Sequence, residues 1–342
     1  MSPNQRYLIL VAPAANRVFA GQAADLAAAE LEICASAASL QVSDIGNREL
    51  AGIDYLGFEL AAAQDARWLH TIAGLSSTYA IFELVDGDLL RPLELINTDR
   101  FSDDLVTIPK YQGKTNEQFT RMMVNVTAAA VRRRSGAADE RLQLLDPLCG
   151  RGTTLSVGLM LGYDVAGVES QQKSVEAYAA FLKSYLRRKR IKHKADFNPV
   201  RREGRSLGRR LQVEVTPPTG GPAQQLTVFT GDTRQSAALY GKRKFDLVVT
   251  DAPYGVVHDS PGKGKSGSAA QLLSEAIGVW AGQLKSGGAL GLSWNTYRIG
   301  REELSSIMIN NGLEPLNDGP YLRFAHRVDA SINRDILVGR RS

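Results

Sequence analysis

The sequence predicts an α/β protein whose mostly parallel, doubly wound sheet is preceded by a smaller α+β domain. From Thr115 onward, strand-like and helix-like stretches alternate strictly, which is typical of repeated β-α units. The first 100 residues have a different pattern, and a length of 342 residues suits about two domains. We expect a small domain over residues 1–100, a linker over 101–114 and the larger domain over 115–342.

The small domain is expected to contain three strands and two helices. An apolar run of strand length at residues 6–11 predicts a buried strand. An Ala-rich helix is predicted at 21–35, a strand at 55–60, a helix at 65–75 and a strand at 78–85. These elements suggest a ferredoxin-like α+β unit.

The larger domain is expected to open with a helix, because Thr115 and Gln118 form the signature of a capping box. This helix is predicted to end near Arg134. The elements expected after it are strands at 142–145, 165–168, 226–230, 245–250, 289–294 and 335–338 and helices at 153–161, 174–190, 269–284 and 301–311. An irregular basic insertion is expected over residues 187–224.

Composition excludes several classes of protein. With 44% hydrophobic and 23% charged residues, the chain is typical of an ordinary soluble protein. It has no apolar run near the ~20 residues of a membrane span and no signal-peptide pattern, so we expect a cytoplasmic protein. Its two cysteines, Cys34 and Cys149, exclude a disulfide framework and a Cys/His zinc site.

Charge is distributed unevenly along the chain. Residues 1–109 carry a net charge of −9 and residues 183–210 a net charge of +10. Such a basic block is typical of a segment that contacts nucleic-acid phosphates, although a solvated helix end followed by a polar loop would have the same composition. The candidate phosphate-binding residues are Arg187, Arg188, Lys189, Arg190, Lys192, Lys194, Arg201 and Arg202.

A Gly-rich turn follows the first predicted strand of the larger domain. Glycines allow a close approach to a ligand, and the following helix N-terminus offers unpaired N–H groups. The turn matches neither a P-loop nor G-x-G-x-x-G, and a purely structural turn is the alternative. The candidate cofactor-binding residues in it are Asp146, Pro147, Cys149, Gly150, Gly152, Thr153 and Thr154.

Two acidic residues end the next two strands. Glu169 lies 17 residues after Gly152, near the ~20-residue spacing at which an acid binds a ribose. Asp232 follows the third strand and could accept a hydrogen bond from an adenine amino group. These residues indicate a cofactor that contains adenosine, without separating NAD from S-adenosylmethionine.

The fourth strand ends in Asp251-Ala252-Pro253-Tyr254, the most specific motif of the chain. It resembles the (Asn/Asp)-Pro-Pro-(Tyr/Phe) motif of class I S-adenosylmethionine-dependent methyltransferases that act on exocyclic amino groups of nucleobases. The chain departs from that motif at Ala252, where proline is usual. The Asp251 carboxylate and the Ala252 carbonyl would accept the two amine N–H groups, Pro253 would fix the bend and Tyr254 would stack on the base.

The resemblance extends to the THUMP-associated tRNA guanine-N2 methyltransferases. It implies a Rossmann-like class I methyltransferase sheet preceded by a ferredoxin-like or THUMP-related domain. It also implies that the segment Thr115–Arg121, which includes Asn116, packs over the methionine end of the cofactor. The expected activity is methyl transfer from S-adenosylmethionine to an exocyclic base amine, with guanine N2 of tRNA or rRNA favoured and no metal required.

Three alternatives remain open at this stage. DNA adenine-N6 methylation would use the same Asp-x-Pro-Tyr chemistry. A non-catalytic nucleic-acid-binding protein with a methyltransferase fold is disfavoured because Asp146, Glu169 and Asp251 are all present. An NAD-dependent oxidoreductase is disfavoured because the turn lacks a third glycine.

Overall fold

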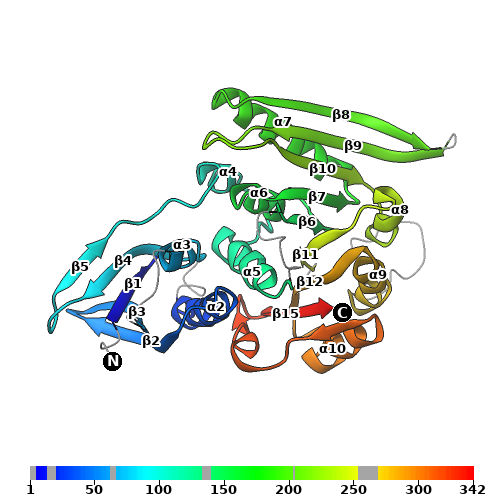
Figure 1. Cartoon of the computed structure of the whole chain (residues 1–342). Coiled ribbons are helices and arrows are strands. Elements are labelled where there is room, and N and C mark those ends of the chain that lie inside the picture. The colour runs from blue at the N-terminus through cyan, green and yellow to red at the C-terminus, as the bar shows by residue number, and fades with distance from the viewer. Residues whose placement is uncertain (1–4, 14–20, 62–66, 133–139, 203–204, 253–268) are drawn as a thin grey trace. The chain divides into compact units, whose positions relative to one another are not determined.

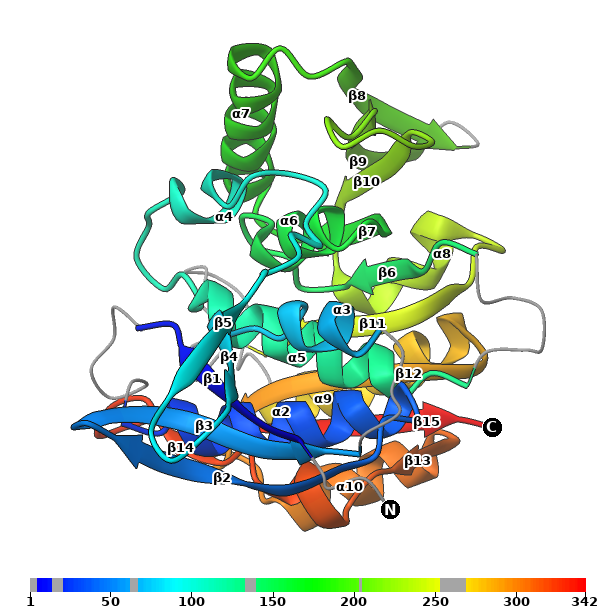
Figure 2. The same cartoon turned by 60° about the vertical axis from the view of Figure 1, so that its left-hand side comes forward.

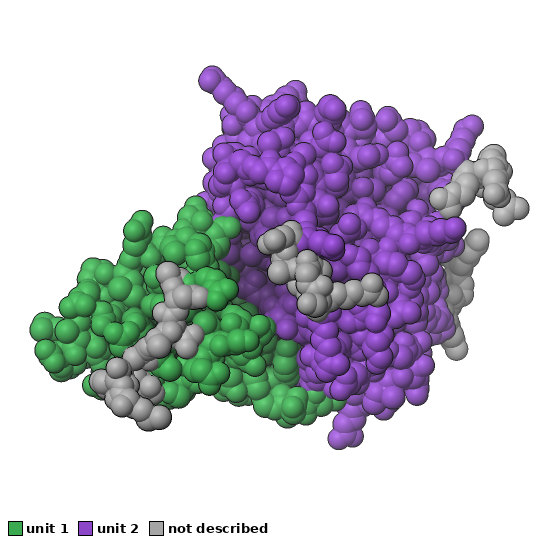
Figure 3. Space-filling model, viewed as in Figure 1, with its two compact units in different colours: residues 1–98, 317–336 green, residues 99–316, 337–342 purple. Residues whose placement is uncertain are grey.

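The computed structural model describes residues 5–13, 21–61, 67–132, 140–202, 205–252 and 269–342. They form two compact units, which Figure 3 shows in different colours. Unit 1 consists of residues 1–98 and 317–336, and unit 2 consists of residues 99–316 and 337–342. The chain therefore leaves unit 2 near its C-terminus, contributes one segment to unit 1 and returns.

Unit 1 contains an antiparallel sheet in the order β2-β3-β1-β4-β5. Leu31 of the first helix and Ile72 of the second share one buried cluster with Ile9, Phe58 and Ile81 of the sheet. The succession β-α-β-β-α-β is that of ferredoxin-like domains. The bounds are β1 (Gln5–Val11), α2 (Ala23–Ala37), β2 (Val42–Leu50), β3 (Ile53–Leu60), α3 (Arg67–Ala73), β4 (Thr78–Leu84) and β5 (Leu90–Leu93).

Two of these strands, β2 and β5, were not predicted from the sequence. β2 includes Asp44, Gly46 and Asn47, residue types that are depleted in strands. Both strands lie at an edge of the sheet, so each pairs on one side only and needs little apolar surface.

The segment 317–336 belongs to unit 1, although the expected larger domain covered all residues from 115 to 342. It contains η2 (Gly319–Leu322) and β14 (His326–Arg327). Arg323 forms an ion pair with Glu32 of α2, and the Arg327 N–H donates to Gln22 Oε1 over 3.3 Å.

Unit 2 is built on a sheet in the order β13-β15-β12-β11-β6-β7-β10-β9-β8 (Figure 1). The strands from β12 through β11, β6 and β7 to β10 are parallel, whereas the pairs β13–β15, β10–β9 and β9–β8 are antiparallel. The bounds are β6 (Gln143–Asp146), β7 (Asp164–Glu169), β8 (His193–Arg202), β9 (Arg205–Val215), β10 (Gln224–Thr230), β11 (Phe245–Asp251), β12 (Leu284–Asn295), β13 (Leu313–Pro315) and β15 (Asn333–Arg341).

Helices cover both faces of this sheet, as the side chains of β12 show. Leu290 and Leu292 pack in one cluster with Trp280, whereas a Cβ at Gly291 would lie 1.9 Å from Thr127 Oγ1 of the helix on the other face. The bounds are α4 (Asp104–Thr107), α5 (Glu117–Ala129), α6 (Thr153–Met160), α7 (Gln172–Arg188), η1 (Thr233–Gln235), α8 (Ser236–Tyr240), α9 (Ala269–Gln283) and α10 (Arg301–Asn310).

The basic insertion over 187–224 is not irregular, contrary to the expectation. Most of it is the antiparallel pair β8–β9, which extends the sheet beyond β10 and lies beside α7 (Figure 2). Leu211, Val213 and Val215 are buried and alternate with Arg210 and Gln212, which are exposed. This two-residue period is the strand signal that the high density of charge obscured.

Candidate active site

The Gly-rich turn connects β6 to α6 at the carboxyl edge of the sheet. Gly150 and Gly152 both have positive φ, +50° and +79°, a conformation that side chains disfavour. A Cβ at Gly152 would also lie 2.5 Å from the ring of Tyr178 on α7. The Cys149 N–H donates to the Val168 carbonyl over 3.0 Å, which holds the turn against β7.

Asp146 at the end of β6 is buried beneath this turn. Its Oδ1 accepts hydrogen bonds from the Leu148 N–H at 3.0 Å and from the Thr250 hydroxyl at 2.8 Å. Burial raises the pKa of Asp146 to about 6, although both hydrogen bonds oppose that shift. A ligand with a positive charge would favour the ionised form of this carboxyl.

Glu169 at the end of β7 is bound to the same turn. One carboxylate oxygen accepts the Gly150 N–H at 3.0 Å, and the other accepts the Gln171 N–H at 2.7 Å. The two features that the sequence places 17–19 residues apart are therefore in direct contact.

Asp251 lies at the carboxyl end of β11, beside the turn. Its Oδ2 accepts a hydrogen bond from the Thr115 hydroxyl over 2.5 Å. The Ala252 N–H donates to the Ser293 carbonyl over 2.8 Å, which joins the start of the motif to β12. The rest of the motif, Pro253 and Tyr254, lies outside the described residues.

Asn116, and not Thr115, is the N-cap of α5, which corrects the expected capping box. The Asn116 side-chain oxygen accepts the N–H groups of Gln118 at 2.8 Å and Phe119 at 3.1 Å. The Thr115 hydroxyl does not cap the helix, because it donates its hydrogen bond to Asp251. The helix ends at Ala129, earlier than predicted.

A cavity of about 300 Å³ lies between these elements. The predicted residues that line it are Thr115, Asp146, Cys149, Gly150, Thr153, Thr154, Asp251 and Ala252. Thr120, from the segment expected to pack over the cofactor, also lines it. Sequence reasoning missed the other lining residues, which are Tyr111, Gly113, Leu148 and Arg151. The Tyr111 hydroxyl lies 2.8 Å from Thr153 Oγ1, and Arg151 stacks on the Tyr111 ring. The expected linker over 101–114 is thus part of unit 2 and forms one wall of the cavity.

Pro147, Gly152, Glu169, Asp232 and Asn116 do not line this cavity. The Asp232 carboxylate caps η1 and pairs with Arg234 at 2.6 Å, while Arg234 also reaches Glu275 at 2.9 Å. The hydrogen bond from Arg234 lowers the pKa of Asp232. An adenine at Asp232 would therefore compete with an existing ion pair.

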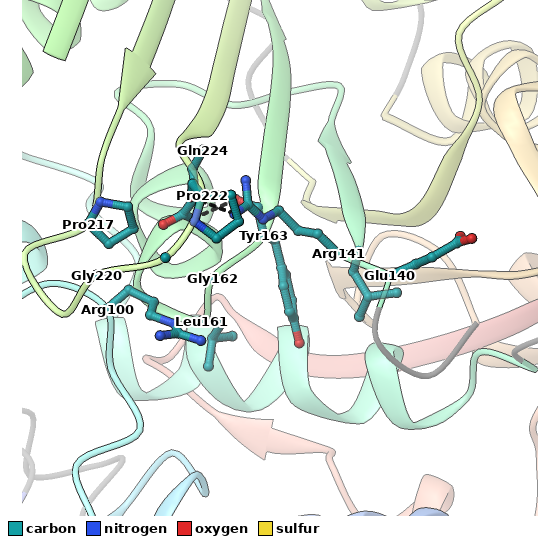
Figure 4. Close-up of a pocket in the computed structure, with 12 residues that line it drawn as sticks. Arg100, Glu140, Arg141, Leu161, Gly162, Tyr163, Pro217, Gly220, Pro222 and Gln224 are labelled. Carbon is teal, nitrogen blue, oxygen red and sulfur yellow. Dashed lines mark hydrogen bonds between the residues drawn. The ribbon is translucent and has the colours of Figure 1, made fainter. Parts of the chain in front are cut away.

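A larger cavity of about 430 Å³ lies at the amino edge of the sheet (Figure 4). Its Arg141 is already held by Asp164 at 3.0 Å and by the Pro222 carbonyl at 2.8 Å. None of the predicted cofactor-binding or catalytic residues lines it. We therefore place the candidate active site in the smaller cavity at the carboxyl edge, where doubly wound sheets bind ligands.

The predicted phosphate-binding residues differ in their surroundings. Lys189 pairs with Asp104 at 2.6 Å and Lys194 with Glu214 at 3.7 Å. The Arg187 guanidinium donates to the Lys183 carbonyl over 3.4 Å. Those that are exposed without an acidic partner among the described residues are Arg187, Arg188, Arg190, Lys192 and Arg201. The side chain of Arg202 lies outside what the structure describes.

In the described part of the chain, no three His, Cys, Asp or Glu side chains gather as metal ligands would. Within the same residues, no helix combines the length and the apolar character needed to cross a membrane.

The parallel strands of unit 2, the helices on both faces and the Gly-rich turn after β6 define a Rossmann-like α/β fold. No protein-family model and no curated protein sequence matches the chain. Solved structures of methyltransferases are among those to which the chain is similar.

Three of these structures illustrate the likeness. Magnesium protoporphyrin IX methyltransferase from Synechocystis PCC 6803, with bound S-adenosylmethionine, is 17% identical over 68% of this chain and 87% of that chain, with a TM-score of 0.41. An rRNA methylase from Streptococcus thermophilus is 9% identical over 68% of this chain and 99% of that chain, with a TM-score of 0.36. TehB from Haemophilus influenzae is 14% identical over 60% of this chain and 59% of that chain, with a TM-score of 0.33.

Proposed function

We propose that this protein is a methyltransferase that modifies an exocyclic base amine of RNA, with guanine N2 of tRNA or rRNA as the favoured target. The observation that carries this proposal is the position of Asp251. Its carboxylate lines the same cavity as the Gly-rich turn, at the carboxyl end of the strand beside β6. An amine-binding group there would lie next to the methyl group of the cofactor.

The residues around the cavity suit the cofactor. When bound, S-adenosylmethionine supplies a methyl group on a positively charged sulfur. Asp146 and Asp251 place two carboxylates at the cavity wall, and the open space beside Gly150 allows a ligand to approach the backbone. Glu169 would hold the ribose and Asp232 the adenine, each by exchanging a present partner for the ligand.

The chain's own groups would prepare the amine for attack. An aromatic amine is a weak nucleophile because its lone pair is delocalised into the ring. Asp251 and the Ala252 carbonyl would accept its N–H groups and direct the lone pair outward. The Thr115 hydroxyl, 2.5 Å from Asp251 Oδ2, would fix the carboxylate, which can take the proton that the methylated amine releases.

The finer likeness to THUMP-associated guanine-N2 methyltransferases is part of this proposal. The β-α-β-β-α-β order of unit 1 supports a ferredoxin-like domain that precedes the catalytic one. Tyr254 would stack on the target base and Pro253 would shape the loop. Both roles rest on the motif alone.

The test is methyl transfer from labelled S-adenosylmethionine to tRNA, rRNA and DNA from a strain that lacks the protein. We expect transfer to RNA, and we expect Asp251→Ala to lower kcat by about 100-fold or more while affinity for S-adenosylmethionine changes only a few-fold. Glu303→Ala, which removes an exposed carboxyl on α10 in the same way, is the matched control.

The other outcomes each reject a part of the proposal. Transfer to DNA alone would identify an adenine-N6 enzyme. Binding of NAD without S-adenosylmethionine in calorimetry would reject the methyltransferase assignment. Loss of cofactor binding in Asp251→Ala would reject the role of Asp251 toward the amine.

A further inference from the structure

The positive charges of the basic insertion fall at opposite edges of the sheet. β7 ends at the carboxyl edge, so α7, which follows it, returns and ends with Arg188 at the amino edge. β8 is antiparallel to β9, which is antiparallel to β10, so β8 runs in the same direction as β10. Figure 1 shows the arrowheads of β7 and β8 toward the same side. The chain therefore carries Arg201 back to the edge where the candidate active site lies.

The distance between the two ends of this hairpin is large. Eight residue steps separate His193 from Arg201 in β8, which corresponds to about 26 Å of extended chain. Arg210 of β9 pairs with Phe229, one residue before β10 ends. The part of β9 that precedes Arg210, and the part of β8 that pairs with it, thus extend past the end of β10.

The far end of the hairpin is fixed in place. Val200 and Leu207 pack against Val168, Phe229 and Leu239. The backbone at Gly208, with φ +90°, lies so close to β10 that a Cβ would be 2.3 Å from the Thr230 carbonyl oxygen. The Arg209 N–H donates to Thr230 Oγ1 over 2.7 Å. This packing holds the hairpin end at the carboxyl edge of the sheet, two strands beyond β7.

Only some of the arginines there can meet a ligand. Arg209 stacks on Phe197 at 4.0 Å and pairs with Glu176 at 3.4 Å, so it serves the fold. Arg201 and Arg210 are exposed and have no acidic partner among the described residues; we call them the tip cluster.

At the amino edge, Arg187, Arg188, Arg190 and Lys192 are likewise exposed and without an acidic partner in the part of the chain that the structure describes. We call them the amino-edge cluster. Both clusters therefore present unneutralised positive charge. Arg201 lies near the far end of the hairpin and Arg210 midway along it, opposite the end of β10, whereas the amino-edge cluster lies where the hairpin begins.

We propose that the tip cluster holds the nucleic-acid backbone next to the nucleobase that enters the active site. The amino-edge cluster is a separate, remote phosphate contact. This inference rests on the proposed function. Along the axis of a duplex each strand advances about 3.4 Å per phosphate, so Arg201 and the amino-edge cluster lie roughly eight nucleotides apart along such a strand. A short RNA at the active site would meet the tip cluster alone, and a longer RNA would meet both.

Two matched double variants test the division. Arg201→Gln with Arg210→Gln removes two charges from the tip cluster. Arg188→Gln with Lys192→Gln removes two charges from the amino-edge cluster. Each is measured with fluorescent RNA of about 5 and about 30 nucleotides, and with methyl transfer to tRNA from the strain that lacks the protein. Unchanged affinity for S-adenosylmethionine checks that each variant is folded.

We expect the tip variant to weaken binding of both RNAs and to raise KM by about tenfold. The amino-edge variant should weaken binding of the long RNA only and should flatten the salt dependence of that binding. If methylation of tRNA persists, two results would overturn the inference. One is that both variants weaken binding of the short RNA equally, and the other is that the tip variant does not change RNA binding. RNA binding without methylation would overturn the proposed function alone, and absence of RNA binding would overturn both.

Discussion

At the scale of single residues, Asp146 combines a structural cost with a functional position. Its carboxyl is buried at the carboxyl edge of the sheet, and burial raises its pKa to about 6. Between pH 4 and pH 6 the folded chain holds a proton that the unfolded chain has lost. Stability therefore falls as the pH rises through this window and levels off above it.

Asp146→Asn should raise the free energy of unfolding at pH 7.5, by on the order of 3 kcal/mol at most, because it removes the buried charge and keeps an acceptor for Leu148 and Thr250. Denaturant unfolding at pH 4 and pH 7.5 measures this gain, which should vanish at pH 4. The same variant should bind S-adenosylmethionine more weakly, and wild-type affinity should fall below about pH 6. A variant that is equally destabilised at both pH values would show that hydrogen bonding, not charge, dominates.

At the scale of elements, the start of α5 divides two tasks between neighbouring residues. Asn116 satisfies the first free N–H groups of the helix, and Thr115 positions Asp251. A capping-box pattern cannot distinguish these roles, because Thr and Asn are both good N-caps.

We expect Asn116→Ala to lower the free energy of unfolding by about 0.5–2 kcal/mol through loss of the cap. Thr115→Val should leave stability nearly unchanged and slow methyl transfer, because the hydroxyl that faces Asp251 is lost. Hydrogen exchange of the first amides of α5, together with single-turnover methylation, separates the two effects. A Thr115→Val variant that exchanges as fast as Asn116→Ala would contradict this assignment.

At the scale of the whole molecule, the two units are joined by more than one chain crossing. The chain enters unit 2 at Asp99, leaves it after Leu316 and returns at Leu337. Unit 1 therefore includes a segment that follows most of unit 2 in the sequence. The contacts of η2 with α2 and the ion pair between Arg323 and Glu32 lie within this unit.

Residues 1–98 produced alone should consequently unfold at a lower temperature than the same residues joined to 317–336 by a Gly/Ser linker. The expected difference is several degrees, since 1 kcal/mol corresponds to about 4–8 °C in a domain of this size. Circular dichroism of the two proteins during heating measures it. Identical unfolding temperatures would show that the segment adds nothing to unit 1.

The amino-acid sequence by itself determined the elements whose signal is local. The β-α units of unit 2 have clear apolar periods, and the Gly-rich turn, Glu169 and Asp251 follow strands whose carboxyl ends meet at one edge. Periodicity and turn chemistry depend only on nearby residues, so they can be read without the fold.

Only the tertiary structure decided which distant segments meet. Tyr111 joins the cavity wall because a segment with no regular pattern packs across the Gly-rich turn. The basic insertion divides into two clusters because β8 forms a strand paired antiparallel with β9. This strand carries Arg201 to the edge of the sheet opposite Arg188. Contacts of this kind arise from strand pairing and side-chain packing between residues far apart in the sequence, and no local period records them.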